Sequence, residues 1–317
     1  MIKKINVSVV VPVYREEEII KDFYNELVKV MEKSGATFEV IFVHDDYSTS
    51  GTMLKLKELH NNDPRVVIIG LTRNFGHQVA LTAGIDYARG EAVVTLDGDL
   101  QHPPELILTL IDYWKKGYDI VYTIRENVLG ESFFKKFSAR MFYLVMSKIS
   151  ETDMGINCAD FRLMSRKTVD EFKRLKEKSR FIRGLVGWMG YKKIGVSYIG
   201  NERAKGKTKF SFRKILSFAL NGILSFSNFP IRLISLFGLI ISSASFIYLI
   251  RVTYYFLFTN EVIPNMLPIT TIILFLCGIQ MLMLGIIGEY IAKIFTETKN
   301  RPIYLVDQIY DKIRSQI

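Results

Sequence analysis

Asp97 and Asp99 stand one residue apart, and the side-chain amide of Gln101 follows two residues later. Carboxylate and amide oxygens are the ligands that hard divalent cations such as Mg²⁺ and Mn²⁺ prefer. A cation bound by these three side chains would in turn hold a diphosphate. The residue types and their spacing therefore predict a Mg²⁺ or Mn²⁺ site that binds a diphosphate.

The acidic pair alone is weak evidence for a binding site, because Asp and Gly are also frequent in solvated turns. Its position in the chain is stronger evidence. The apolar run 91–96 predicts a buried strand that ends just before Asp97, and Pro103 and Pro104 open a helix directly afterwards. In open α/β sheets, ligands bind beyond the carboxyl ends of the strands. The context favours a binding site over a solvated turn.

Apolar runs alternate with helical patterns through the first part of the chain. Strands are expected at 5–13, 38–43, 66–71, 91–96 and 120–123, and helices at 16–32, 52–60, 78–88 and 104–116. This alternation predicts an α/β fold with a mainly parallel sheet covered by helices on both faces. Neither a Gly-x-Gly-x-x-Gly fingerprint nor a Walker-type loop is present, which argues against two common nucleotide-binding folds.

Two long apolar segments follow the α/β region. Residues 233–250 carry no charge, and at 1.5 Å per residue they span roughly 27 Å, close to the ~30 Å core of a bilayer. Residues 262–288 form a second uncharged run. We expect two transmembrane helices, at about 231–257 and 263–288, rather than a buried hairpin of a soluble core. Lys and Arg flank the pair on both outer sides, which places both ends in the cytoplasm.

These patterns divide the chain into four parts. We expect residues 1–209 to form a cytosolic α/β domain, 210–229 a juxtamembrane interfacial helix, 230–292 the two transmembrane helices, and 293–317 a cytosolic C-terminal tail. The basic and aromatic segment 131–149 is compatible with either an interfacial helix or a core-facing helix. We see no N-terminal signal peptide, and the separated Cys158 and Cys277 indicate free thiols in a reducing compartment. The expected location is the plasma membrane, with a multi-pass topology.

The charge distribution narrows the choice of partners. The formal net charge is +10, and the stretch 166–214 is especially basic before it leads into the apolar segments. An anionic membrane surface or a phosphate-bearing substrate fits this order better than nucleic acid does. The four histidines are scattered along the chain, which argues against a zinc site.

Several separated motifs resemble those of the family 2 glycosyltransferases of GT-A fold, a Rossmann-like class with a mixed, mainly parallel sheet. The closer resemblance is to the polyprenyl-phosphate glycosyltransferases, a group that includes dolichol-phosphate mannose synthase and bacterial undecaprenyl-phosphate glucosyltransferases. It covers nearly the whole chain, including both apolar segments. The motifs are 10–18 (VVPVYREEE), 73–78 (RNFGHQ), 83–90 (AGIDYARG), 96–101 (LDGDLQ), 160–164 (DFRLM) and 181–185 (FIRGL) with Trp188, Arg203 and Lys209.

The resemblance implies a role for particular residues. Asp97, Asp99 and Gln101 would hold the metal, with Asp99 and Asp160 as catalytic residues. Asp45 and Asp46 would bind uracil and ribose, because carboxylates accept hydrogen bonds from such groups. The residues implied on the donor side are Pro12, Tyr14, Glu16, Asp45, Asp46, Arg73 and Asp97. The residues implied at the acceptor phosphate are Arg125, Arg162, Arg203 and Lys209.

The chain departs from the family pattern at a few positions. Tyr47 replaces a Gly and Ser50 an Asp in the second motif, and a Tyr where the backbone needs a positive φ implies an altered turn. His102 and Asn221 each stand at a position where the family commonly has Asp. We expect neither of these last two to touch the chemistry directly.

The reaction implied by the resemblance moves a hexose from a nucleotide sugar, with UDP-glucose or a related UDP-hexose expected, to undecaprenyl phosphate with inversion, for cell-envelope glycan modification. A phosphate monoester has a second pKa of about 6 and is mostly dianionic at pH 7. Asp160 is therefore expected to position Arg162 or the metal ligands, with general-base action as the other possibility. A homo-oligomer, by resemblance a tetramer, is also expected.

Two other functions compete with this interpretation. A processive polysaccharide synthase would need a Gln-x-x-Arg-Trp motif and further membrane spans, and neither is present. A catalytically impaired membrane scaffold or flippase partner is the alternative from a different class. Tyr47 and Ser50 keep it open, whereas the intact Asp97, Asp99 and Asp160 oppose it.

Overall fold

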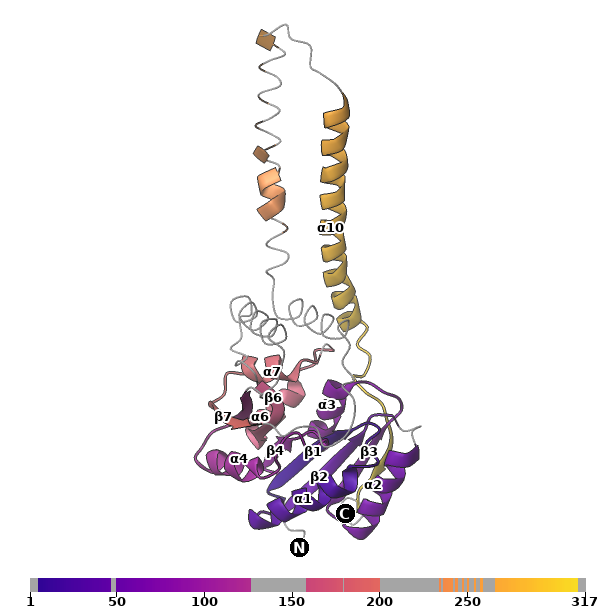
Figure 1. Cartoon of the computed structure of the whole chain (residues 1–317), viewed down its shortest axis with the longest axis vertical. Helices are drawn as coiled ribbons and strands as arrows, with labels where there is room; N and C mark the ends of the chain where they lie inside the picture. The colour runs from indigo at the N-terminus through magenta and orange to yellow at the C-terminus, as the bar shows by residue number, and fades with distance from the viewer. Residues whose placement is uncertain are drawn as a thin grey trace. The chain divides into compact units, whose positions relative to one another are not determined.

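The structure is a computed structural model that describes residues 5–46, 50–126, 158–178, 180–199 and 266–312, with isolated positions between 234 and 258. The chain divides into two compact units (Figure 1). The first comprises Met1–Ala219 with Arg301–Ile317, and the second comprises Leu220–Asn300. The segments predicted at 131–149 and 210–229 lie outside the described residues, as do Tyr47, Arg203 and Lys209.

An eight-stranded sheet forms the centre of the first unit, in the order β7-β5-β6-β4-β1-β2-β3-β8. Its parallel pairs are β1–β2, β1–β4, β2–β3 and β5–β7, while β6 runs antiparallel to β4 and β5, and β8 to β3. The predicted mixed, mainly parallel α/β sheet is thereby confirmed. The strands are β1 (Val7–Val13), β2 (Phe38–His44), β3 (Val66–Leu71), β4 (Ala92–Thr95), β5 (Ile120–Glu126), β6 (Cys158–Ser165), β7 (Lys193–Ile199) and β8 (Val306–Tyr310).

Helices cover both faces of this sheet, which explains why β1 to β4 are buried along their whole length. Val9 and Val11 of β1 join the core that contains Phe23 of α1. Val10 points the other way, toward α3 at Gly84. Burying such a side chain contributes about 1.5–3 kcal/mol. The helices of this unit are α1 (Ile20–Lys33), α2 (Ser50–Asn62), α3 (His77–Tyr87), α4 (Leu106–Lys115), α6 (Arg166–Arg174) and α7 (Ile182–Trp188).

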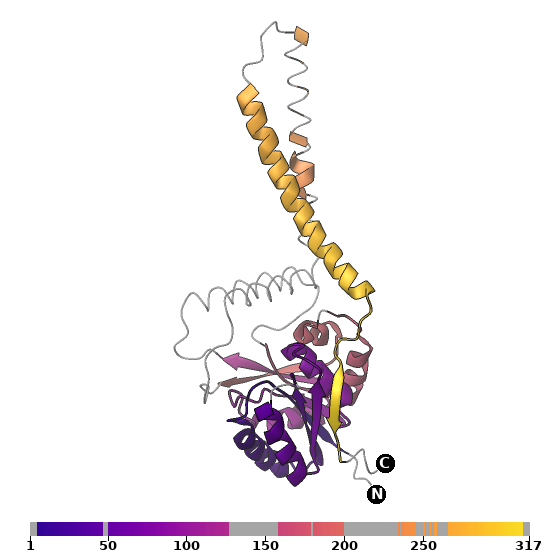
Figure 2. The same cartoon turned by 90° about the vertical axis from the view of Figure 1, so that its right-hand side faces the viewer.

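The strand β8 comes from the predicted C-terminal tail and completes the sheet beside β3 (Figure 2). Ile309 stands opposite Ile69 in an antiparallel register. The Tyr304 hydroxyl donates to Asp86 Oδ2 at 2.8 Å, and Arg89 Nη1 lies 3.1 Å from Asp311 Oδ2. Residues 306–310 are therefore part of the first unit, although they follow the apolar segments in the sequence.

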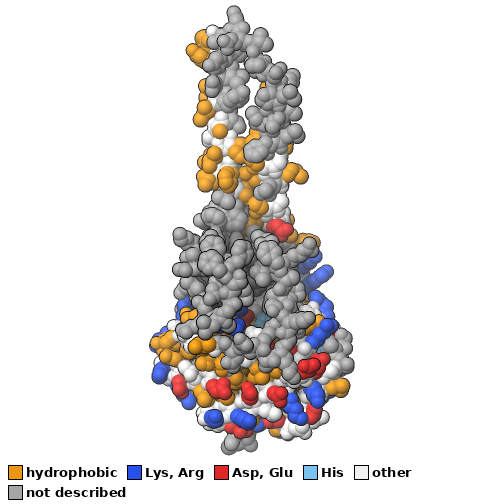
Figure 3. All heavy atoms as spheres, in the orientation of Figure 1, with side chains coloured by type: hydrophobic (Ala, Val, Ile, Leu, Met, Phe, Trp, Pro, Cys, Tyr) orange, Lys and Arg blue, Asp and Glu red, His pale blue; other side chains and the backbone are white. Residues whose placement is uncertain are grey.

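The second unit contains α10 (Met266–Thr298). Within the described residues, its portion Leu276–Thr298 is the one helix that has the length and composition to cross a membrane. Hydrophobic side chains cover much of the described surface of this unit (Figure 3), with Met281, Leu284 and Ile291 among the exposed ones. The helix continues ten residues beyond the predicted span 263–288. The predicted span 231–257 lies largely outside the described residues, so a pair of transmembrane helices stays a prediction.

Candidate active site

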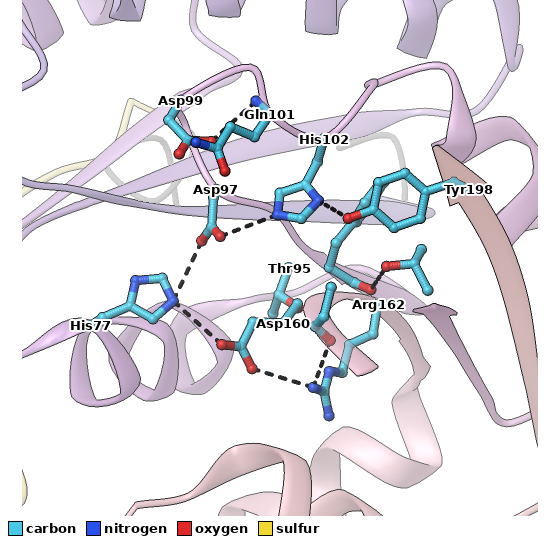
Figure 4. A network of polar contacts seen from close by, with 12 residues as sticks. His77, Thr95, Asp97, Asp99, Gln101, His102, Asp160, Arg162 and Tyr198 are labelled. Carbon is cyan, nitrogen blue, oxygen red and sulfur yellow. Dashed lines mark hydrogen bonds and ion pairs between the residues drawn. The ribbon is translucent and has the colours of Figure 1, made fainter. Parts of the chain in front are cut away.

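Asp97 and Asp160 lie close together at the carboxyl end of β4, where His77 bridges them (Figure 4). His77 Nε2 is 3.4 Å from Asp97 Oδ1 and 3.7 Å from Asp160 Oδ2. The antiparallel pairing of β6 with β4 produces this arrangement, because it places Arg162 opposite Thr95. The Thr95 hydroxyl also donates to the backbone oxygen of Asp160 at 2.5 Å. Residues 63 positions apart thus share one site.

The second oxygen of Asp97 faces another imidazole. His102 Nε2 lies 3.4 Å from Asp97 Oδ2, and the other ring nitrogen, Nδ1, is 2.5 Å from the hydroxyl of Tyr198. Burial alone would raise the pKa of Asp97. The neighbouring His77 and His102 lower it by more, so the net pKa lies below its ordinary value. His102 was expected not to touch the chemistry directly. The structure places its ring against Asp97, and the part that either residue takes in the chemistry stays a prediction.

Asp160 is buried and held by four side chains. Arg183 of α7 binds it through two bonds, Nε to Oδ1 and Nη2 to Oδ2, both at 2.9 Å. Gln78 Nε2 donates to Oδ2 at 3.0 Å, and Arg162 Nη2 donates to Oδ1 at 3.3 Å. Burial alone would raise the pKa of Asp160, but Arg183, His77 and Arg162 hold it well below its usual range. The carboxylate is therefore charged at neutral pH and is a weak base.

His77 begins α3, next to a loop that Asp45 fixes. The carboxylate of Asp45 accepts from the backbone N–H of Phe75 at 2.7 Å and of Gly76 at 2.9 Å. Burial lowers the pKa of His77, yet Asp97 and Asp160 outweigh it and raise that pKa to about 9. A cationic imidazole thus stands between the two acids. Asp45 supports this loop, and its role toward uracil stays a prediction.

Asp99 and Gln101 complete the turn after β4. The backbone N–H of Gln101 donates to Asp99 Oδ1 at 3.2 Å. In the part of the chain that the structure describes, no group of three His, Cys, Asp or Glu side chains is arranged to hold a metal ion alone. Asp97, Asp99 and Gln101 offer only oxygen ligands, which fits Mg²⁺ or Mn²⁺ when phosphate or water oxygens supply the remaining ligands.

The predicted nucleotide residues Pro12, Tyr14 and Glu16 lie at or just beyond the end of β1. A Cβ atom at Gly98 would come within 3.0 Å of Glu16 Oε2, so Glu16 adjoins the Asp97–Asp99 turn. Pro12 pairs with Val43 of β2, and the Arg15 guanidinium covers the Tyr14 ring at 5.1 Å. The roles of these three residues toward the nucleotide stay predictions.

Asp46 and Arg73 lie beyond β2 and β3. Asp46 has a φ of 146°, so the unusual backbone conformation falls on the residue before Tyr47. Arg73 is exposed and stacks on the Phe75 ring at 4.0 Å. Neither residue is shown contacting Asp97 or Asp160, and their roles toward the nucleotide stay predictions.

The predicted phosphate residues differ in their surroundings. Arg162 is buried and donates to the backbone oxygen of Ala159 at 3.0 Å as well as to Asp160. Arg125 stands opposite Tyr198 in the β5–β7 pair, and its buried Nε finds no hydrogen-bond partner among the described residues. Arg162 is thus built into the support of Asp160, and the roles of both arginines at a phosphate stay predictions.

The sequence indicated no site role for Gln78, Arg183 and Tyr198, and no contact of His77 with the two acids. Arg183 lies within the motif 181–185, which was a usable signal. Tyr198 lies in no motif, and only the pairing of β7 with β5 brings it to the site.

The family model described as "Glycosyl transferase family 2" matches residues 8–172. The chain is 46% identical over 310 residues to an uncharacterized glycosyltransferase, YkcC, of Bacillus subtilis (strain 168), covering 98% of this chain and 96% of that protein. It is 40% identical over 305 residues to a bactoprenol glucosyl transferase of Shigella phage SfX, with 95% and 98% covered. A prophage bactoprenol glucosyl transferase homolog of Escherichia coli (strain K12) is 38% identical over 303 residues, with 96% and 99% covered.

These matches cover the strands and helices that carry the site. The chain therefore belongs to glycosyl transferase family 2, and it is a glycosyltransferase.

Proposed function

We propose that the protein transfers a hexose from a UDP-hexose, UDP-glucose being the first candidate, to undecaprenyl phosphate with inversion at the anomeric carbon. The names of two relatives that match almost the full length, both bactoprenol glucosyl transferases or homologues, support this substrate pair. The basic stretch 166–214 and the apolar α10 support an anionic lipid acceptor. The product would be polyprenyl-phosphate hexose for cell-envelope glycan modification.

One observation carries the proposal. Asp97 and Asp99 follow β4 directly, and β6 brings the buried Asp160 against Asp97. A Mg²⁺ or Mn²⁺ ion bound by Asp97, Asp99 and Gln101 would supply Lewis-acid stabilisation of the departing diphosphate. An impaired scaffold would have no need for this convergence of charged groups in a buried position.

In the proposed reaction, an acceptor phosphate oxygen forms a bond to the anomeric carbon. The bond from that carbon to the diphosphate oxygen breaks, and UDP leaves with the electron pair. The acceptor is already dianionic at pH 7, so Asp160 need not remove a proton. Asp160 instead fixes Arg162 and Arg183, and Arg125 offers a donor to a phosphate oxygen.

We further infer that the first unit, which is the catalytic unit of this proposal, faces the cytosol at the plasma membrane, as the basic flanks of the apolar segments indicate. Since β8 belongs to the catalytic unit, residues 301–312 must lie on the same side of the membrane as that unit. Assembly into a homo-oligomer, a tetramer by family resemblance, is part of this proposal.

The test is a transfer assay with the purified full chain, undecaprenyl phosphate, Mn²⁺ or Mg²⁺, and a panel of UDP- and GDP-sugars. We expect a lipid-linked hexose by mass spectrometry, with the anomeric configuration opposite to that of the donor. EDTA should abolish the transfer, and restored Mn²⁺ should recover it. Asp99→Ala should lower kcat on the order of 100-fold. Transfer that persists in EDTA, or no transfer from any donor, would contradict the proposal.

A further inference from the structure

The contact between His102 and Asp97 is built into the core rather than formed at the surface. The side chain of His102 is 9% exposed, whereas that of His77, on the other oxygen of Asp97, is 44% exposed. Phe161 packs edge-on against the His102 ring at 5.8 Å, and Tyr198 lies at 5.6 Å between ring centroids. Of the two imidazoles, His102 is the one whose position the fold fixes.

The contact between the Tyr198 hydroxyl and Nδ1 favours a proton on Nε2 of His102. A phenol has an ordinary pKa of about 10, and it is neutral and a donor at pH 7. When it donates to Nδ1, the imidazole proton resides on Nε2, which faces Asp97 Oδ2 at 3.4 Å (Figure 4). The opposite tautomer would turn a nitrogen lone pair toward the carboxylate. The geometry therefore points to a proton on Nε2, directed at the carboxylate.

We propose that Tyr198 and His102 form a positioning pair that holds the Asp97 carboxylate in the orientation needed to bind the donor's divalent cation. This inference rests on the proposed function. The 3.4 Å separation is longer than a typical hydrogen bond, so the contact orients Oδ2 without occupying it fully. Partners that orient metal ligands typically change the affinity for the metal by 10- to 100-fold when they are removed.

The central variant is Tyr198→Phe, which keeps the ring and removes the hydroxyl. Its matched control is Tyr24→Phe on α1, because the Tyr24 hydroxyl also makes a part-buried bond to a side chain outside the site, Asp63 at 2.7 Å. A second pair separates the two nitrogens of His102. The amide nitrogen of His102→Gln can replace Nε2–H, whereas that of His102→Asn lies nearer the position of Nδ1.

The readout is the Mn²⁺ concentration that gives half of the maximal rise in Tm of the full chain at a fixed UDP concentration, since a bound ligand stabilises the folded state. We expect this concentration to rise about tenfold in Tyr198→Phe and His102→Asn. Tyr24→Phe should leave this Mn²⁺ concentration unchanged. In His102→Gln it should stay much closer to the parent value than in His102→Asn. In transfer assays, the KM for the donor should rise while the KM for the acceptor stays constant.

A merely structural role for Tyr198 predicts a different result. Tyr198→Phe and Tyr24→Phe would then both lower Tm, and neither would move the Mn²⁺ midpoint, which would overturn the proposed pair. A parent chain whose stabilisation by UDP does not depend on Mn²⁺ would refute the metal site itself. The two failures are distinguishable, because failure of the Tyr198–His102 pair is seen only by comparing the variants with the parent, whereas failure of the metal site is seen in the parent itself.

Discussion

At the scale of single residues, Asp160 gives the clearest prediction. Because its folded pKa lies well below the ordinary 3.8, it binds a proton only as the pH falls below that value. The parent enzyme should therefore show no ionisation limb from Asp160 between pH 5 and 8. Arg183→Gln removes an ion pair that lowers this pKa, so the burial that raises it prevails. We expect a new acidic limb, in which the rate falls as pH falls.

The measurement is kcat/KM across pH 5 to 8 for the parent, Arg183→Gln and Asp160→Asn. At pH 7 the loss in Arg183→Gln should be on the order of 100-fold, because a displaced catalytic group has effects of that size. The new limb should be absent from the double variant that also carries Asp160→Asn. A limb present in the parent and lost in Asp160→Asn would instead establish Asp160 as a general base.

The identities of the charged residues were predictable from the sequence, but their partners were not. Asp97, Asp99 and Asp160 stand out by type, spacing and family resemblance. The bond between Tyr198 and His102 joins residues 96 positions apart, and no local pattern records such a distance. Arg162 is different, because Asp160 was expected to position it, and Arg162 does donate to that carboxylate. Its role at a phosphate stays a prediction.

At the scale of elements, α3 packs on the sheet through a glycine. A Cβ atom at Gly84 would lie 2.2 Å from Val10 Cγ1, whereas one at Gly278 in α10 would meet no atom within 4 Å. Gly84→Ala should destabilise the fold by about 1–3 kcal/mol through overpacking. Gly278→Ala is the matched control at a helical glycine and should not lower Tm. Equal Tm values for the two variants would contradict this close packing.

The predictability of the elements follows the strength of their patterns. The strands β1 to β4 are continuous apolar runs, buried on both faces, and their predicted positions agree with the structure to within about two residues. We predicted no strand at β6, β7 or β8. The residues of β8 alternate between half-buried and exposed positions, and this short edge strand forms through its pairing with β3, which is remote in sequence.

At the scale of the whole molecule, the chain returns to its catalytic sheet after α10. The hydroxyl of Tyr304 holds this return segment through Asp86. Tyr304→Phe removes a hydrogen bond to a carboxylate, and we expect a cost of about 1–3 kcal/mol. Hydrogen exchange of the amides in 306–310 should accelerate accordingly, because local opening becomes easier. Tyr24→Phe should not accelerate exchange there, and slow exchange in both variants would argue against this anchoring role.

The pairing of β8 with β3 has a consequence for how the protein is made. Translation proceeds along the chain, so the ribosome synthesises β8 only after the apolar helix that we assign to the bilayer. Until then the outer edge of β3 presents unpaired backbone groups, which are a template for aggregation. Under the proposed membrane arrangement, the sheet is completed only after α10 has been synthesised, and the edge of β3 is unpaired in that interval.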